Sequence, residues 1–323
     1  MLIQPRRLRN NTLLREAVAG EEPRKKSLVM PCFVVPGKNK KEAISSLPGI
    51  YRYDPDSLVK YVQGLLKTGL NKIVLFGAGD KKSPDGKSSL NEKGPVGLAV
   101  KKLKKEFGDA LFLITDVCLC PYTTHGHCGI VNTAGVDNTA SVKAISAMAL
   151  SHAQWGADMV SPSDMMDGRV LAIREVFEKN GYGTLPIMSY AVKFASSYYG
   201  PFREAAGSSP GKGDRKSYQM DFRNRKDAIR EALLDEQEGA DLLMIKPALA
   251  YLDILKAVHE VSTLPLACYN VSGEYAMVMA AVAKGWIAEK EIVIENFTAF
   301  KRAGASLIFS YHAEKAAREN WLD

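Results

Sequence analysis

The sequence contains few cysteines and no long hydrophobic run. Five cysteines among 323 residues is a sparse and odd number, unlike the disulfide frameworks of small secreted proteins. No segment approaches the roughly 18 consecutive apolar residues that a membrane-spanning helix needs. The first residues are basic but lack the apolar core of a secretory signal. We therefore expect a protein of a reducing, cytoplasmic compartment with no membrane segment.

The sequence also lacks a long block of charge of either sign. The formal net charge is +7, which would suit a nucleic acid or an acidic small molecule as a partner. The basic residues, however, fall into short separate groups at residues 24–26, 38–41, 81–82 and 101–105. No RNA-recognition signature or helix-turn-helix accompanies them. We expect a solvated basic surface and no nucleic-acid partner.

Eight short apolar runs alternate along the chain with longer amphipathic segments. The runs are almost continuously apolar, as expected for parallel strands that are buried on both faces. In the longer segments apolar residues recur every three or four positions, which is typical of helices. The eight predicted strands are residues 28–35, 72–77, 111–116, 158–163, 186–191, 242–246, 265–270 and 306–311.

Several helix-to-strand junctions share one pattern, with a glycine between the two elements. The stretches "WGADMV", "EGADLL" and "AGASLI" place Gly156, Gly239 and Gly304 where a left-handed residue ends a helix. Eight such units favour an α/β fold of the (β/α)8 TIM-barrel type. An open doubly wound sheet is the alternative, but residues 76–89 follow a strand without the dinucleotide-binding fingerprint.

The first 25 residues lie outside the eight strand–helix units. They are basic and partly helical, and they cannot bury their own apolar residues. Such a segment usually docks on another surface. We expect residues 1–25 to form an extended N-terminal arm for subunit contacts and residues 26–323 to form a single catalytic barrel.

Two lysines lie where predicted strands end, which is where barrels carry their active sites. Lys246 ends one apolar run and Lys193 lies just beyond another. One such lysine alone would usually extend into water. Two at one barrel mouth would lower each other's pKa by repulsion and burial, and a neutral amine can form a Schiff base with a ketone. Other polar residues at predicted strand ends are Asp116, Ser163, Tyr269 and Tyr311.

Residues 194–222 form a long segment without helical or strand periodicity. Such a segment inside a compact domain is usually functional or disordered. Arg203, Arg215 and Gln219 lie within it and could bind carboxylates, since guanidinium groups pair with them in bidentate geometry. Its glycines could act as hinges, and aromatic residues within it argue against disorder, among them Tyr198, Tyr199, Phe202 and Tyr218. We expect a lid over the site.

The stretch "DVCLCPYTTHGHCGI" at residues 116–130 contains three cysteines, Cys118, Cys120 and Cys128. A structural zinc site normally has four ligands, commonly in two pairs. Three thiolates with an open fourth position fit a catalytic zinc, whereas a fourth ligand from His125 or His127 would make the site structural. The loop alone does not decide between them. Its place on the rim that carries the lysines favours a catalytic zinc.

Six ordered motifs resemble the porphobilinogen synthase family, also called 5-aminolevulinate dehydratases. They are "DVCLCPYTTHGHCG", "SPSDMMDGR", "SYAVKFASSYYGPFREAAGSSP", "GDRKSYQ", "MIKPALAYLD" and "YNVSGEYAM". The resemblance runs from about residue 3 to residue 320. It implies the condensation of two 5-aminolevulinate molecules to porphobilinogen with loss of two waters. This reaction is an early step of tetrapyrrole biosynthesis, which leads to haem and chlorophyll.

The resemblance also implies roles for individual residues. Lys246 matches the lysine that binds the first substrate as a Schiff base, and Lys193 matches the second such lysine. The first substrate's carboxylate would be held by Ser272 and Tyr311, and the second's by Arg203, Arg215 and Gln219. The zinc ligands would be Cys118, Cys120 and Cys128. Residues that would position substrate or transfer protons are Asp116, Ser163, Tyr199 and Tyr269.

Family members further suggest a second metal and an assembly. Glu231 matches the position of a glutamate at a magnesium site, Mg²⁺ acting there as an allosteric ion at a subunit contact. The family assembles mainly as homo-octamers through its N-terminal arm, which "PRRLRNNTLLREAV" resembles up to Leu14. We therefore expect a homo-octamer.

Two other functions remain as alternatives on the residues alone. One is a Schiff-base aldolase that uses a single lysine and a structural zinc. The other is a basic, zinc-stabilised protein that binds nucleic acid in a salt-dependent manner.

Overall fold

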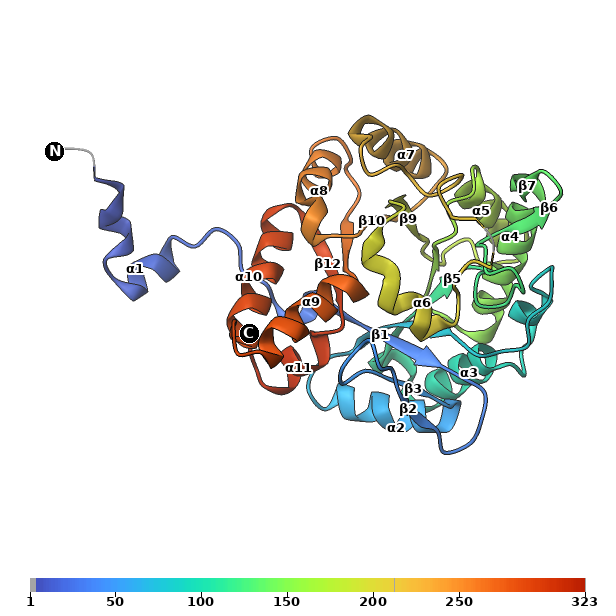
Figure 1. Ribbon diagram of the computed structural model, residues 1–323, viewed down its shortest axis with the longest axis horizontal. Helices are drawn as coiled ribbons and strands as arrows, with labels where there is room; N and C mark the ends of the chain where they lie inside the picture. The colour runs from blue at the N-terminus through green and yellow to red at the C-terminus, as the bar shows by residue number, and fades with distance from the viewer. Residues whose placement is uncertain (1–3, 212, 323) are drawn as a thin grey trace.

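Eight parallel strands surrounded by helices form the body of the protein in the computed structural model, which describes residues 4–211 and 213–322 (Figure 1). Residues 1–3 of the expected arm, with residues 212 and 323 of the expected barrel, lie outside this description. The barrel strands are β1 (Leu28–Val34), β4 (Lys72–Gly77), β5 (Phe112–Val117), β8 (Met159–Pro162), β9 (Met188–Lys193), β10 (Leu242–Lys246), β11 (Leu266–Asn270) and β12 (Ala305–Ser310).

The strands follow one another around a nearly closed ring. Their hydrogen-bonded order is β8-β5-β4-β1-β12-β11-β10-β9. A single parallel bridge between Val160 and Ile187 joins the two ends of this order. All eight predicted strands are present, with ends that differ by no more than two residues from those predicted. The (β/α)8 prediction is therefore confirmed. The four short additional strands are β2 (Lys41–Ala43), β3 (Tyr51–Tyr53), β6 (Ile130–Asn132) and β7 (Gly135–Asp137).

The helices around the barrel begin and end where local chemistry favours it. In α2 the Asp54 side chain accepts the backbone N–H groups of Asp56 and Ser57, which caps the helix, and the buried Leu58 and Val62 face the strands. The described helices are α1 (Thr12–Ala17), α2 (Pro55–Leu66), α3 (Pro95–Phe107), α4 (Asn138–Trp155), α5 (Arg169–Lys179), α6 (Gly200–Ala206), α7 (Arg225–Gln237), α8 (Leu252–His259), α9 (Ser272–Ala283), α10 (Glu289–Arg302) and α11 (Ala313–Arg318).

The three glycine junctions have the backbone conformation that the sequence predicted. Gly156, Gly239 and Gly304 have φ angles of 104°, 98° and 111°, a region that side chains disfavour. At Gly304 a Cβ atom would lie 2.4 Å from Cγ of His259. These junctions return the chain from the helix layer to β8, β10 and β12.

One buried ion pair links α5, α7 and β9. The Arg169 guanidinium donates to both carboxylate oxygens of Asp235, at 3.1 and 2.8 Å. It also donates to Ser189 Oγ at 2.9 Å. Only 2% of the Arg169 side chain and 3% of the Asp235 side chain are exposed. Nε of Arg169 also lies 3.9 Å from Oδ2 of the buried Asp164, so two carboxylates compensate the guanidinium charge and Asp235 makes the closer contacts.

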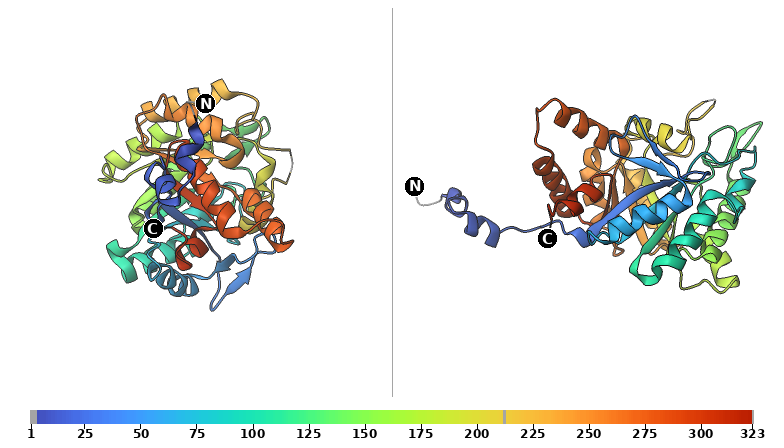
Figure 2. Two further views of the ribbon diagram at one scale, coloured as in Figure 1. Left: turned by 90° about the vertical axis from the view of Figure 1, so that its left-hand side faces the viewer. Right: turned by 90° about the horizontal axis from the view of Figure 1, so that it is seen from below.

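The N-terminal segment stands apart from the barrel. Its short 3-10 helix Pro5–Arg9 and α1 extend away from the body (Figure 1; Figure 2, right). Neither helix has a buried residue. Leu13 and Val18 are 74% and 53% exposed. The segment thus presents apolar side chains that the barrel of its own chain does not cover.

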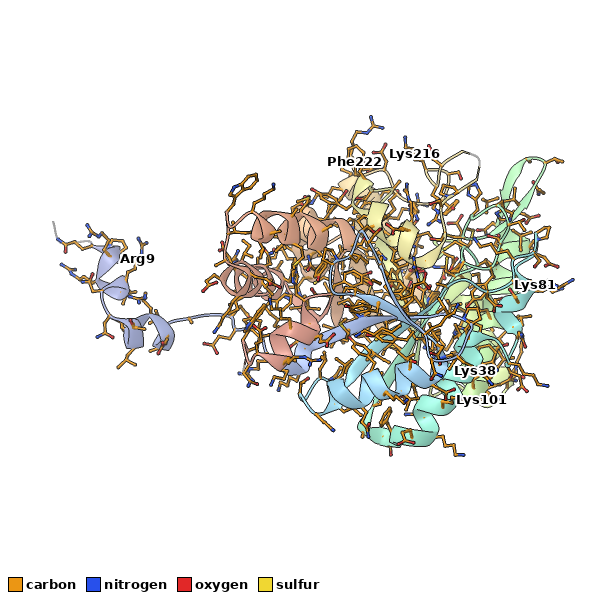
Figure 3. The ribbon with its side chains drawn as sticks, turned by 60° about the horizontal axis from the view of Figure 1, so that its bottom comes forward. Arg9, Lys38, Lys81, Lys101, Lys216 and Phe222 are labelled. Atoms are coloured by element: carbon orange, nitrogen blue, oxygen red, sulfur yellow. The ribbon has the colours of Figure 1, made fainter. Side chains whose placement is uncertain are left out.

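Basic side chains are distributed over the surface of the protein. Figure 3 shows Arg9 on the arm, and Lys38, Lys81, Lys101 and Lys216 on several sides of the barrel. Within the part of the chain that the structure describes, no helix is both long and apolar enough to cross a membrane.

Replacing Asp235 with alanine should remove the closer of the two buried carboxylates that compensate the Arg169 charge. We expect a loss of about 3–5 kcal/mol in the free energy of unfolding. Urea titration followed by circular dichroism at pH 7 would measure it. The matched control is Glu175→Ala, because Glu175 pairs with Lys179 on the surface of α5, where such a pair contributes about 0.5 kcal/mol or less. Equal effects of the two changes would contradict this account of the buried pair.

Candidate active site

Two lysines lie side by side at the carboxyl end of the barrel. Lys193 ends β9 and Lys246 ends β10, and the two residues are paired in register in these neighbouring strands. Only 6% of Lys193 and 4% of Lys246 is exposed. Their Nζ atoms lie 5.6 and 5.1 Å from the centre of the Tyr190 ring. The structure therefore brings both predicted lysines together in one interior space.

Aromatic rings surround the Lys246 amine. Its Nζ lies 4.3 Å from the ring centre of Tyr269, 4.9 Å from that of Phe202 and 5.4 Å from that of Tyr199. Burial, with the positive charge of Lys193, lowers the pKa of Lys246 to about 7. A large fraction of this amine is therefore neutral, and hence nucleophilic, at neutral pH.

The position of Tyr190 depends on an irregularity in β9. Leu243 pairs with Ser189, whereas Ile245 pairs with Val192. Three residue steps on β9 therefore match two on β10, as at a β-bulge. Tyr190 and Lys193 are three residues apart and would face opposite sides of a regular strand. The shift lets both face the same space.

An acidic residue stands close to the lysines. Asp116 is buried near the carboxyl end of β5. Burial raises its pKa to about 6, although a hydrogen bond with Ser163 and the charges of the two lysines act in the opposite direction. The Lys193 Nζ donates a hydrogen bond to the carbonyl oxygen of Ser163. A carboxyl group with a pKa near neutrality can both accept and donate a proton during a reaction.

These side chains line one cavity at the carboxyl ends of the strands. A second pocket adjoins it, with Arg203 and Arg215 in the lining of both. Gln219 lines the second pocket. The lining of the first cavity consists of Phe76, Asp116, Cys120, Pro121, Ser163, Lys193, Tyr199, Phe202, Arg203, Arg215 and Lys246.

Three nitrogen donors in these pockets are well placed for an anion. Nε of Arg203, Nε of Arg215 and Nε2 of Gln219 are buried, with no hydrogen-bond partner among the described residues. The Nη2 of Arg215 is held by the carbonyl oxygens of Gly126 and Ser208, at 2.8 and 2.5 Å. Burial and the nearby Arg215 charge lower the pKa of Arg203. A carboxylate would satisfy the donors and relieve the repulsion between the two cations.

The segment that carries these donors is more regular than predicted. Residues 194–222 contain the 3-10 helix Ser197–Tyr199 and the helix α6, so the prediction of an aperiodic segment is wrong in this part. Pro201 lies in the first turn of α6, and Gly207 ends it with a φ angle of 58°. Seven residues are too few to show a helical period in the sequence.

A second polar group lies on the Lys246 side. Ser272 begins α9, and its Oγ accepts the N–H of Phe202 at 3.0 Å. The hydroxyls of Tyr269 and Tyr311 are 3.3 Å apart. Both tyrosines are buried. Tyr311 and Ser272 thus each contact a residue whose ring lies against the Lys246 amine, Tyr269 in the first case and Phe202 in the second.

The three cysteines of the loop after β5 form a buried cluster. Their sulfur atoms all lie within 4.8 Å of one another, and Cys118 Sγ is 3.3 Å from Cys120 Sγ. Cys120 also lines the cavity of the two lysines. Closely spaced thiols are the donors that Zn²⁺ prefers. The cluster could therefore hold a metal ion, at the edge of the lysine cavity.

Neither histidine of this loop belongs to the cluster. His125 Nε2 lies 3.2 Å from the carbonyl oxygen of Pro84, and His127 Nδ1 lies 3.1 Å from the hydroxyl of Tyr218. Among the described residues, the sole group of three or more possible ligands consists of the three cysteines. The structure thus favours the three-sulfur arrangement over a four-ligand site completed by a histidine.

Glu231 lies away from the lysine cavity. It is half-buried on α7 and lines a separate pocket with Asp167 and Asp227. Burial, with the nearby charge of Asp235, raises its pKa. Gln219 also lines this pocket, so the predicted magnesium ligand is absent from the lysine cavity but shares one lining residue with the predicted carboxylate site.

Two aromatic residues close to the lysines, Tyr190 and Phe76, were not named from the sequence. Tyr190 contacts both lysine amines, and Phe76 lines the cavity from the end of β4. Phe76 ends a predicted apolar strand and could have been found from that position. Tyr190 could not, because its direction depends on the register shift in β9.

Lys246 should react with an amine reagent such as acetic anhydride with a pH midpoint near 7. The reason is that its pKa is lowered to about 7, so the nucleophilic neutral amine forms above that pH. Mass spectrometry of peptides would give the acetylation rate, normalised to the exposed Lys179. Asp116→Asn should shift the midpoint to lower pH, since this carboxylate raises the Lys246 pKa. A midpoint near the ordinary lysine value of about 10.4 would contradict the prediction.

Comparisons with known proteins identify the family. The family profile described as "Delta-aminolevulinic acid dehydratase" matches residues 2–319. Proteins of that name from Bacillus subtilis (strain 168) and Methanothermus sociabilis are 46% and 49% identical. The matches cover 98% and 97% of this chain, and 97% of each relative.

A solved structure agrees over the whole barrel. It is the delta-aminolevulinic acid dehydratase (porphobilinogen synthase) from Toxoplasma gondii ME49 in complex with the reaction product porphobilinogen. The TM-score is 0.96 at 42% identity, covering 99% of this chain and 92% of that chain. With its barrel, paired lysines and cysteine cluster, the chain therefore belongs to the delta-aminolevulinic acid dehydratase family.

Proposed function

We propose that this protein condenses two molecules of 5-aminolevulinate to porphobilinogen with loss of two waters, an early step of tetrapyrrole biosynthesis. The observation that carries the proposal is the pairing of Lys193 with Lys246 in one buried cavity. Each substrate has one ketone and one carboxylate, so two substrates need two amines and two carboxylate sites. The second pocket supplies one such site, and the hydroxyls of Ser272 and Tyr311 supply the other.

The two lysines would hold the substrates through their ketones. The neutral amine of Lys246 attacks the ketone of the first substrate, releases water and forms a Schiff base, and Lys193 does the same with the second. A protonated Schiff base acidifies the adjacent carbon, which loses a proton and attacks the Schiff-base carbon of the other substrate, whose lysine amine then leaves. One C–C bond and one C–N bond join the substrates. Both lysines leave as free amines, and the net loss is two waters.

The carboxylates would fix the two substrates in different directions. Arg203, Arg215 and Gln219 bind the second carboxylate with donors that otherwise lack partners. Ser272 and Tyr311 bind the first one. Holding each substrate at both its ketone and its carboxylate lowers the entropic barrier to their reaction.

Proton transfers would use the polar groups around the amines. Asp116 has a pKa of about 6, and it is close enough to both lysines for their charges to lower that pKa. Ser163, Tyr199 and Tyr269 orient the amines and the substrate. Tyr199 donates a hydrogen bond at 3.1 Å to the carbonyl oxygen of Lys246. The segment around α6 limits the entry of water.

The thiolates of Cys118, Cys120 and Cys128 would hold a catalytic Zn²⁺. When bound, zinc supplies a Lewis acid that polarises oxygen or holds an amino group. The support for it is the close spacing of the three buried sulfurs and the place of Cys120 in the cavity lining.

Assembly and location are further parts of the proposal. The exposed apolar residues of the arm support docking on neighbouring subunits, in a homo-octamer. Glu231, with acidic neighbours, would bind an allosteric Mg²⁺ where a second subunit completes the site. Free buried cysteines fit a reducing, cytoplasmic compartment.

Incubation with 5-aminolevulinate should yield porphobilinogen, and reduction with borohydride should leave adducts on both Lys246 and Lys193. Peptide mass spectrometry would locate them. Lys246→Met and Lys193→Met should each lower turnover by about 10⁴-fold or more. Lys256→Met is the matched control, because Lys256 is exposed on α8, and it should retain activity. An adduct on one lysine alone would favour a single-lysine aldolase, and adducts on neither would remove the mechanism.

Replacing Cys120 with serine should remove the metal. A hydroxyl is a poorer zinc ligand than a thiolate, and we expect zinc affinity to fall by more than about 100-fold. Chelator competition and elemental analysis would measure zinc per chain independently of activity. Cys268→Ser is the matched control, since Cys268 is equally buried but lies in β11. Equal zinc contents in the two variants would contradict the assignment.

A further inference from the structure

Glu274 is a buried carboxylate that the proposed reaction does not use. It lies in the first turn of α9 and is 1% exposed. One oxygen, Oε2, accepts the backbone N–H of Val271 at 2.9 Å and the Asn270 Nδ2 at 3.0 Å. The other, Oε1, accepts the backbone N–H of Leu249 at 2.8 Å. A single carboxylate therefore joins the loop after β10 to the loop after β11.

The network continues to the end of β12. Asn270 Oδ1 accepts a hydrogen bond from Ser310 Oγ at 2.8 Å, and Ser310 Oγ accepts the backbone N–H of His312 at 3.2 Å. Asn270 and Ser310 are also paired in register between β11 and β12. Both residues are buried. Three consecutive strands are therefore tied together at their carboxyl ends.

Each hydrogen-bonded residue of this network lies within three positions of a residue that would bind the first substrate. Leu249 is three residues after Lys246, and Val271 immediately precedes Ser272. At the far end, His312 immediately follows Tyr311. Asn270 likewise follows Tyr269, whose ring contacts the Lys246 amine. The hydrogen bonds found for the Glu274 side chain do not extend to β9, which carries Lys193.

Helix capping alone does not explain this arrangement. A capping residue at this position needs one bond, to the N–H before the helix, and Oε2 makes that bond to Val271. The bond from Oε1 to Leu249 reaches a different segment, the start of the 3-10 helix Leu249–Tyr251 after β10. Burial raises the pKa of Glu274 to about 7, so the carboxylate is retained at a cost in desolvation. Three hydrogen-bond donors offset that cost.

We propose that Glu274 is a positioning residue for the half of the active site that binds the first substrate. It fixes Lys246, Ser272 and Tyr311 relative to one another, and it leaves the Lys193 half unaffected. This inference rests on the proposed function, because the two halves are defined by the two substrates.

The test is the balance between the two Schiff bases in Glu274→Gln. The amide has nearly the same shape, but it turns one acceptor into a donor that faces another N–H group. Enzyme and 5-aminolevulinate below saturation are quenched with borohydride, and adducts on both lysines are quantified by mass spectrometry. We expect the ratio of Lys246 adduct to Lys193 adduct to fall about tenfold, since small misplacements impair such attack strongly.

Two further variants complete the test. Asp158→Asn alters a carboxylate that accepts the N–H of Leu113 at the amino end of β5, on the opposite rim, and should leave the ratio unchanged. Ser310→Ala removes the two outer bonds of the network, those with Asn270 and His312, and leaves the bonds of Glu274 intact, so it should lower the ratio about twofold to threefold. If Glu274→Gln does not fold, the adduct ratio of Ser310→Ala tests the proposal in its place.

The outcomes separate this inference from the proposed function. A selective fall in the Lys246 adduct supports the positioning role. An unchanged ratio, or an equal loss at both lysines, overturns it and leaves Glu274 as a residue of general stability. Absence of both adducts in the unaltered protein would instead overturn the proposed function.

Discussion

The site depends on two amino groups that are buried side by side. Lys193 and Lys246 are paired in neighbouring parallel strands, so their backbones lie about 4.8 Å apart. In the interior of a protein, positive charges on two such neighbouring side chains repel each other strongly and have lost their hydration. The arrangement is stable when at least one amine is neutral. A neutral amine is also the form of lysine that can attack a ketone at neutral pH.

Much of the surrounding structure can be understood from this constraint. Aromatic rings rather than carboxylates enclose Lys246, which keeps water away without restoring a full ion pair. Asp116 provides one nearby negative charge that is itself weakened by burial. The cysteine cluster and the two arginines lie at the edge of the same cavity. Arginine, aspartate and cysteine side chains thus surround the two lysine amines, and the total charge of the cavity can remain small.

A large part of the fold could be predicted because buried parallel strands leave a strong pattern. Runs such as residues 242–246 are apolar throughout, and glycines such as Gly304 mark the junctions. Lys193 was expected just beyond a strand and instead ends it, since the pairing of β9 with β10 extends the strand. The helix α6 was missed because it is short and its contacts with α9 are not visible as a local period.

Residue types and their order along the chain were thus sufficient for the barrel, for the lysines at strand ends and for the grouping of three thiols within one loop. Tertiary structure alone decided which side chains meet. The register shift in β9 turns Tyr190 towards the lysines, the histidines of the cysteine loop find partners elsewhere, and Glu274 joins two loops. The reason is that side-chain direction and loop contact depend on pairing between segments far apart in sequence, which no local pattern records.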